Sequence, residues 1–241
     1  MGAALEAAMV LAAGLGTRLR PLTEKMPKPL VPVAGKPLID HVLDRLTEAG
    51  LGRAVVNVHH LADQLTAHLA SRTNPRIVIS DEREHLLDSG GGVLKALPQL
   101  GPGPFLIHNC DSIWTEGEAS NLTRLARCWD ETIMDCLLLL APAATSLGYQ
   151  GRGDFAIETS GQLRRRGGAE SAPFAFTGVS LAHPRLFDGA PSGSFSLNRP
   201  WDAAIARGRA FGIVLEGQWM HVGDPAAVTA ADGWIRSRHE R

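Results

Sequence analysis

A glycine-rich turn followed closely by two cations is the part of the sequence best suited to chemistry. Gly14 and Gly16 form the turn, which comes directly after the apolar run at residues 8–12. Glycines let the backbone approach an anion closely and direct N–H groups at it, because no side chain intervenes. Arg18 lies just beyond the turn, and Lys28 stands between two prolines that restrict its backbone. A guanidinium and an ammonium beside such a turn predict phosphate binding and phosphoryl-transfer chemistry.

The elements around this turn predict a parallel sheet that would position it. Apolar runs at residues 54–58, 76–80 and 105–109 alternate with helical patterns at residues 38–49 and 61–69. This alternation implies crossover helices and a three-layer α/β/α sandwich, a Rossmann-like fold with a mixed, mostly parallel sheet. Ligands of such a sheet gather at the carboxyl ends of its strands, where the glycine turn would lie.

The second half of the chain has a different sequence pattern, with short apolar runs separated by Gly, Pro and Ser. We expect strands at residues 134–140, 154–158, 174–181 and 211–215, and a final helix at residues 225–237. We interpret these strands as additions to the same sheet. Residues 1–241 are therefore predicted to form one domain with a core from about residue 8, with no repeat domain after it.

The composition of the chain argues against some classes of binding partner. The 24 Lys and Arg residues balance 25 Asp and Glu residues, so the net charge of -1 gives no broad attraction for nucleic acid or an anionic membrane. The apolar run at residues 136–141 is too short to cross a membrane. Cys110, Cys128 and Cys136 form no C-x-x-C pair, and their odd number suits a reducing compartment. We therefore expect a cytoplasmic protein with small-molecule partners.

The segment at residues 11–30, LAAGLGTRLRPLTEKMPKPL, resembles the signature of the sugar-1-phosphate nucleotidyltransferases. The resemblance covers essentially the whole chain from residue 9 and continues in PVAGKPL at residues 32–38, DSGGG at 88–92, NCD at 109–111 and WMHVG at 219–223. Within the family, the chain is most similar to the bacterial N-acetylmuramate-1-phosphate uridylyltransferases of cell-wall recycling.

The resemblance implies the reaction and a set of binding residues. A nucleoside triphosphate and a sugar 1-phosphate, in first place UTP and N-acetylmuramate 1-phosphate, would give an NDP-sugar and pyrophosphate. Arg18 would bind the β- and γ-phosphates, Lys28 would bridge the α-phosphate and the sugar phosphate, and Asp111 would bind Mg²⁺ or Mn²⁺. The implied nucleotide contacts are Leu11, Ala12, Ala13, Gly14, Gly16, Thr17, Arg18, Lys28, Glu82, Gly90 and Gly91. The implied sugar contacts are Asn109, Asp154, Glu170 and Thr177.

The sequence departs from the family pattern at two places. Relatives commonly have a second metal-binding Asp where this chain has His221, and imidazole suits softer metals better than Mg²⁺. Ligation by His221, charge supplied by Asp224, and Asp111 acting with phosphates and water all remain open. Many relatives also have a lysine beside Glu170 that this chain lacks, so Arg152 is a candidate for binding the sugar phosphate.

Two other functions fit the same residues. One is a guanylyl- or thymidylyltransferase that acts on mannose, heptose or glucose 1-phosphate. The other is an inactive regulatory protein that still binds a nucleotide. The histidine at position 221 favours this function, whereas Arg18, Lys28 and Asp111 oppose it. In all three cases we expect a monomer or a weak homodimer.

Overall fold

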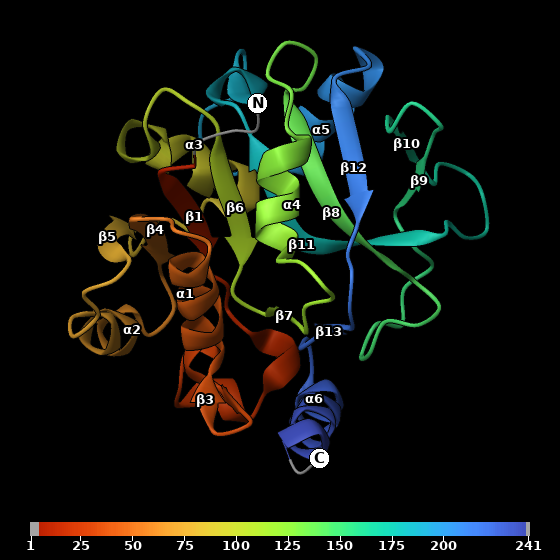
Figure 1. Ribbon diagram of the computed structural model, residues 1–241. Coiled ribbons are helices and arrows are strands. Elements are labelled where there is room, and N and C mark those ends of the chain that lie inside the picture. The colour runs from red at the N-terminus through yellow and green to blue at the C-terminus, as the bar shows by residue number, and fades with distance from the viewer. Residues whose placement is uncertain (1–4, 240–241) are drawn as a thin grey trace.

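Strands from both halves of the chain form one central sheet in the computed structural model, which describes residues 5–239 (Figure 1). The strands of this sheet are β1 (Ala7–Leu11), β4 (Arg53–Val58), β5 (Arg76–Asp81), β6 (Phe105–Asn109), β8 (Cys136–Pro142), β9 (Phe155–Ile157), β10 (Leu163–Arg165), β11 (Phe174–Ala182) and β12 (Ala210–Val214). The path β10–β9–β11–β6–β1–β4–β5 crosses the sheet, and β8 pairs with β11 and β12 beside it. Strands β1, β4, β5 and β6 are parallel, whereas β11 is antiparallel to both β6 and β8.

Helices cover the two faces of this sheet and bury an apolar layer on each. The helices that contribute to one layer are α1 (Leu38–Glu48), α2 (Ala62–Leu69) and α4 (Asn121–Cys128), and those of the other layer are α3 (Asp88–Leu100) and α5 (Asn198–Ala206). Side chains alternate between the two layers along β1, with Ala8 and Val10 in the first and Ala7 and Met9 in the second. The predicted three-layer sandwich with a mixed sheet is therefore confirmed.

A smaller core joins the early loops to the end of the chain. It contains Leu19, Val31, Met220, Val222 and Ala231. The elements around it are β2 (Pro32–Val33), β3 (Lys36–Pro37), β7 (Ser112–Trp114), β13 (Trp219–His221), α6 (Pro225–His239) and the 3₁₀ turns η1 (Thr17–Leu19), η2 (Leu22–Glu24) and η3 (Lys28–Leu30). Strand β13 pairs antiparallel with β7, so residue 221 lies next to the end of β6. Packing in this core holds the segment that carries Arg18 and Lys28 close to β13.

The predicted strands and helices of the first half agree with the structure to within one or two residues. The sequence pattern predicts no helix over α3, yet residues 88–100 are helical. Three consecutive glycines and Pro98 are poor helix formers, and here the packing of Val93, Ala96 and Leu100 against the sheet overrides that propensity. The short helices α4 and α5 and the strands β7 and β13 are also absent from the sequence-based prediction.

All three cysteines are free. Burial raises the pKa of Cys110 to about 12, so this thiol stays protonated and inert although it lies beside the candidate site. Across residues 5–239, none of the helices combines the length and the apolar character needed to span a bilayer.

His108 is a buried histidine of β6 that makes stability depend on pH. It stacks on Trp114 with ring centroids 5.3 Å apart, and burial lowers its pKa to about 4. The unfolded chain takes up a proton at this residue below about pH 6.5, whereas the folded chain resists protonation down to about pH 4. We therefore expect the free energy of unfolding to fall by about 3 kcal/mol from this residue as the pH decreases through that range.

Urea unfolding of the wild type and of a His108→Phe variant at pH 7 and pH 4.5 isolates this effect, because Phe keeps the stacking and removes the proton. The Asp and Glu residues are the same in both proteins, so their titration contributes equally to both losses of stability. The wild type should lose about 2 kcal/mol more than the variant between the two pH values, because the titration of His108 is not complete at pH 4.5. Equal losses would show that His108 does not carry the dependence.

Candidate active site

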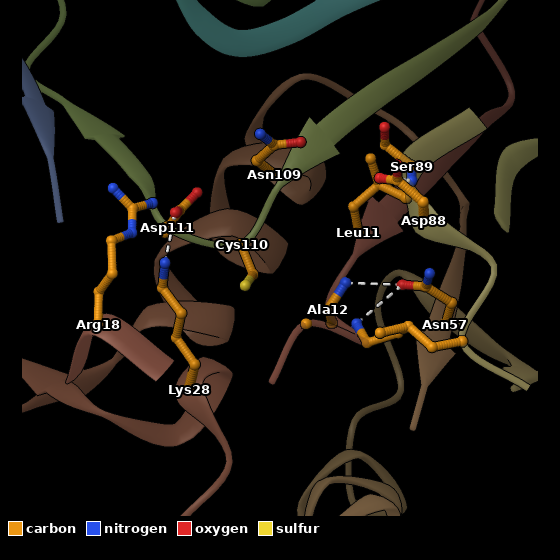
Figure 2. A pocket seen from close by; sticks show the side chains of 13 residues that line it. Leu11, Ala12, Arg18, Lys28, Asn57, Asp88, Ser89, Asn109, Cys110 and Asp111 are labelled. Carbon is orange, nitrogen blue, oxygen red and sulfur yellow. Dashed lines mark hydrogen bonds and ion pairs between the residues drawn. The ribbon is translucent and has the colours of Figure 1, made fainter. Parts of the chain in front are cut away.

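A cleft of about 460 Å³ opens at the carboxyl ends of β1 and β6 (Figure 2). Its lining residues are Leu11, Ala12, Ala13, Gly14, Arg18, Lys28, Asn57, Leu86, Asp88, Ser89, Asn109, Cys110 and Asp111. Leu11 and Asn109 are paired across the two strands, so the segments that follow both strands emerge side by side. The cleft lies where the sequence analysis expects ligands to bind, at the carboxyl edge of the parallel strands.

Two cations and a carboxylate meet at one end of this cleft. Lys28 Nζ lies 2.5 Å from Asp111 Oδ2, and the two side chains are 12% and 16% exposed. Figure 2 shows the guanidinium of Arg18 pointing toward the same carboxylate. Burial by itself would raise the pKa of Asp111, but the positive charge and the hydrogen bond of Lys28 oppose burial, and this pKa is held below its usual value. Asp111 is therefore ionised at neutral pH, and the end of the cleft keeps a net positive charge for phosphate.

The tight fold of residues 16–28 brings the two cations to the same side. Gly16 has φ +62, a left-handed conformation that favours glycine, and its carbonyl accepts a hydrogen bond of 2.8 Å from Thr23 Oγ1. A Cβ on Gly16 would lie 2.8 Å from the methyl carbon of Thr23 and 3.2 Å from the Cβ of Lys28. A side chain at this position would push the segment of Lys28 away from the turn.

His221 lies at the same end of the cleft, although it comes from a distant part of the sequence. Strand β13 brings it opposite Ser112, and Val222 N donates to Asp111 O at 3.1 Å. A Cβ on Gly223 would lie 2.6 Å from His221 Nε2 and 3.3 Å from Arg18 Nη1, so the imidazole and the guanidinium flank this glycine. Burial lowers the pKa of His221; Asp111 opposes this effect, while Lys28 and Arg18 add to it. The imidazole is therefore neutral at pH 7, and its unprotonated nitrogen can act as a metal ligand.

The carboxylate of Asp224 lies at the start of α6. Its Oδ1 accepts a hydrogen bond of 2.9 Å from Ala227 N, which caps the start of α6. The carboxylate is thus used by the helix terminus, where a negative charge is favourable.

The residues of the first loop divide into two groups. Leu11, Ala12, Ala13 and Gly14 line the cleft as expected, but the amides of Ala12 and Ala13 already donate to Asn57 Oδ1 at 2.7 and 3.2 Å. Thr17 and Gly16 are not among the residues that line it. Gly16 therefore acts by shaping the turn.

The glycines at residues 90–92 serve packing within the protein. Gly90 N and Gly91 N both donate to Phe195 O, at 2.8 and 3.1 Å. A Cβ on Gly90 would lie 2.4 Å from the ring of Phe195, and one on Gly91 would lie 2.3 Å from Gly193 O. At Gly90 and Gly91, which the resemblance implies as nucleotide contacts, the close approach is made by the segment at residues 193–195. Leu86, Asp88 and Ser89 supply the cleft wall instead.

The predicted sugar contacts are spread over several environments. Asn109 lines the cleft, whereas Glu170 lies on an exposed turn. Thr177 is buried and its hydroxyl donates to Leu139 O at 2.8 Å, so it belongs to the strand β11 and not to the cleft surface. Asp154 Oδ2 accepts from Phe176 N at 2.8 Å, which ties the loop before β9 to β11.

Five residues that line the cleft were not predicted as site residues. They are Asn57, Leu86, Asp88, Ser89 and Cys110. Asn57 gave a signal that was available in the sequence, since it is a polar residue between valines at the end of a strand expected to be buried. Glu82, which the resemblance implies as a nucleotide contact, is buried behind the cleft wall. It accepts a hydrogen bond from Asn57 Nδ2 at 2.8 Å.

Comparisons with known proteins identify relatives of the whole chain. Residues 8–139 match the family model of the MobA-like NTP transferase domain. An N-acetylmuramate alpha-1-phosphate uridylyltransferase of Caulobacter vibrioides is 48% identical over 96% of this chain and 98% of its own length. One of Neisseria meningitidis serogroup B is 35% identical over 90% of this chain and 92% of its own length. A structure of a putative glucose-1-phosphate thymidylyltransferase from Bacillus anthracis shares the fold, with a TM-score of 0.80 at 17% identity over 97% of this chain and 96% of that one.

Proposed function

The chain belongs to the MobA-like NTP transferase family, among the sugar-1-phosphate nucleotidyltransferases, and on that basis we propose that it converts UTP and N-acetylmuramate α-1-phosphate to UDP-N-acetylmuramate and pyrophosphate. The choice of substrates is supported by the similarity to the uridylyltransferases over almost the full length of both chains. The observation that carries the chemistry is the meeting of Arg18, Lys28 and Asp111 at one end of the cleft.

In this reaction an oxygen of the sugar phosphate attacks the α-phosphorus of the nucleotide in line. A new P–O bond forms as the bond to the bridging oxygen of the β-phosphate breaks, and the electron pair leaves with pyrophosphate. The enzyme must therefore hold two anions together and stabilise charge on the leaving group. We assign the leaving pyrophosphate to Arg18 and the α-phosphate and sugar phosphate to Lys28.

Lys28 is well placed for this role because Asp111 orients it. The ion pair fixes the ammonium at the mouth of the cleft, and the other N–H donors of the ammonium can bind phosphate oxygens. The lysine does not have to be ordered when substrates bind, so less conformational entropy is lost at that step.

The donors at this end fit a metal ion that is shared with substrate. Among residues 5–239 there is no cluster of three or more His, Cys, Asp or Glu side chains able to hold a metal ion. Mg²⁺ in phosphate-transfer sites is commonly held by one or two carboxylates together with substrate phosphates and water. We propose that Asp111 and His221 would hold Mg²⁺ or Mn²⁺ in this way. When bound, the metal would neutralise charge on the phosphates.

The histidine at position 221 gives a testable metal preference. Because imidazole suits softer metals than carboxylate does, we expect His221→Asp to raise the ratio of kcat/KM with Mg²⁺ to kcat/KM with Mn²⁺ by ~10-fold. Calorimetric titration of Mn²⁺ into the nucleotide-bound wild type and variant gives a readout that is independent of turnover. Identical Mn²⁺ affinities and an unchanged activity ratio would contradict ligation by His221.

Pyrophosphate release with each nucleoside triphosphate and a panel of sugar 1-phosphates tests the proposed reaction. UTP with N-acetylmuramate α-1-phosphate should give the largest kcat/KM. Faster turnover of GTP with mannose or heptose phosphate would contradict the proposed substrates, and no turnover of any pair would favour a regulatory role.

We also propose that the enzyme works in the cytoplasm, a view supported by its three free cysteines.

A further inference from the structure

Asn57 is a buried polar residue near the end of β4 that connects the two walls of the cleft. It is 3% exposed and lies between the buried side chains of Val56 and Val58. Burying a side-chain amide costs free energy unless its donor and acceptor groups are hydrogen bonded. Its Oδ1 meets this requirement by accepting from Ala12 N and Ala13 N in the first wall, at 2.7 and 3.2 Å.

The other end of the same amide reaches the second wall through a carboxylate. Asn57 Nδ2 donates to Glu82 Oε1 at 2.8 Å, and Glu82 Oε2 accepts from Leu87 N at 3.1 Å. Glu82 is 1% exposed, so these bonds form away from water, where they are strong. Leu87 lies between Leu86 and Asp88, which line the cleft.

Helix α3 leaves room for this pair of side chains. A Cβ on Gly92 would lie 2.8 Å from Glu82 Oε1 and 2.9 Å from Asn57 Nδ2. The absence of a side chain at residue 92 therefore lets the helix pack directly on the hydrogen bond between the two side chains. The bond is enclosed by the protein on this side, which limits its movement.

We propose that Asn57 is a positioning residue for the nucleotide: with Glu82, it fixes the separation of the two loops that form the walls of the cleft. The inference rests on the proposed function for the identity of the ligand. Asn57 acts through the backbone of Ala12 and Ala13 on one side and of Leu87 on the other. The phosphate end at Lys28 is held separately by its ion pair with Asp111.

The chemistry of the contacts explains why asparagine is suited to this position. Its oxygen faces two N–H donors, and its nitrogen faces a carboxylate, so both ends of the amide are matched. Aspartate would keep the acceptor for Ala12 and Ala13 but place two buried carboxylates against each other. Exchanging Glu82 for glutamine as well would supply the missing donor and restore every bond, with the negative charge moved to residue 57.

The test compares Asn57→Asp with the double variant Asn57→Asp/Glu82→Gln. The single variant should bind UTP ~10-fold more weakly in calorimetry and raise KM for UTP more than KM for the sugar phosphate. The double variant should recover most of the UTP affinity, and Asn74→Asp, which adds the same charge on the exposed surface, should match the wild type. Wild-type UTP affinity in a folded Asn57→Asp, or a double variant no better than the single one, would overturn the proposal.

Hydrogen exchange at the amides of residues 12, 13 and 87 gives a second measurement that needs no ligand. Exchange at these amides should be faster in Asn57→Asp than in the wild type and slow again in the double variant. If the proposed function fails, the wild type turns over no substrate pair while this exchange pattern is still seen. If Asn57→Asp does not fold, a double variant that folds and binds UTP supports the proposal, and one that does not fold overturns it.

Discussion

Replacement of Lys28 by alanine is expected to lower kcat/KM for the complete reaction by ~10²–10³-fold. The ammonium is held at the end of the cleft by Asp111, where it faces the phosphates that must be brought together. Its removal takes away positive charge at the place where negative charge is concentrated in the transition state. It also leaves the carboxylate of Asp111 without its ion pair, so we expect Tm to fall by ~2–4 °C. Pyrophosphate release and thermal unfolding of the same preparation measure both effects.

Lys25→Ala is the matched control, because Lys25 is an exposed lysine outside the residues that line the cleft. It should retain the activity of the wild type. Lys28→Arg helps to separate charge from geometry: partial recovery would show that a cation is required, and its placement also matters. Wild-type turnover in a folded Lys28→Ala protein would refute the role assigned to this lysine.

Replacement of Asp111 by asparagine is expected to lower kcat/KM by a similar ~10²–10³-fold. The two side chains have nearly the same shape, and the amide oxygen can still accept a hydrogen bond from Lys28, so the change removes mainly a negative charge. A weaker donor for the metal should also raise the Mg²⁺ concentration needed for half-maximal rate. Rates measured over a series of Mg²⁺ concentrations report both changes.

Asp188→Asn provides the control for this substitution, since Asp188 is exposed at the end of a short 3₁₀ turn away from the cleft. Its metal dependence should equal that of the wild type. If Asp111→Asn keeps both its rate and its Mg²⁺ requirement, the carboxylate is not part of the reaction centre.

The strands of the first half could be predicted because a buried parallel strand has a local signature. Residues 54–58 are apolar except for Asn57, and residues 105–109 begin with three apolar residues; both runs form strands, as β4 and β6. Helix α3 could not be predicted in the same way, because its reasons for being helical lie elsewhere in the chain. Gly90 and Gly91 are required by contacts with residues 193–195, about one hundred residues away.

The site shows the same division between local and long-range information. Arg18, Lys28 and Asp111 could be found from their motifs, and the structure brings them together. The burial of Thr177 could not be found, because it depends on a bulge in β11 between Phe176 and Val179. Asn57 was not predicted because its partners, Ala12, Ala13 and Glu82, lie in the segments that follow β1 and β5, far from it in the chain.

The pairing of β7 with β13 also makes this end of the cleft depend on a segment that is translated late. A nascent chain that has left the ribosome through β7 already carries Arg18, Lys28 and Asp111, yet β7 has no antiparallel neighbour until residues 219–221 are translated. The backbone N–H of Val222 then donates to the carbonyl of Asp111, and His221 pairs with Ser112. This end of the cleft is therefore completed only after residues 219–222 have been translated and have docked against β7.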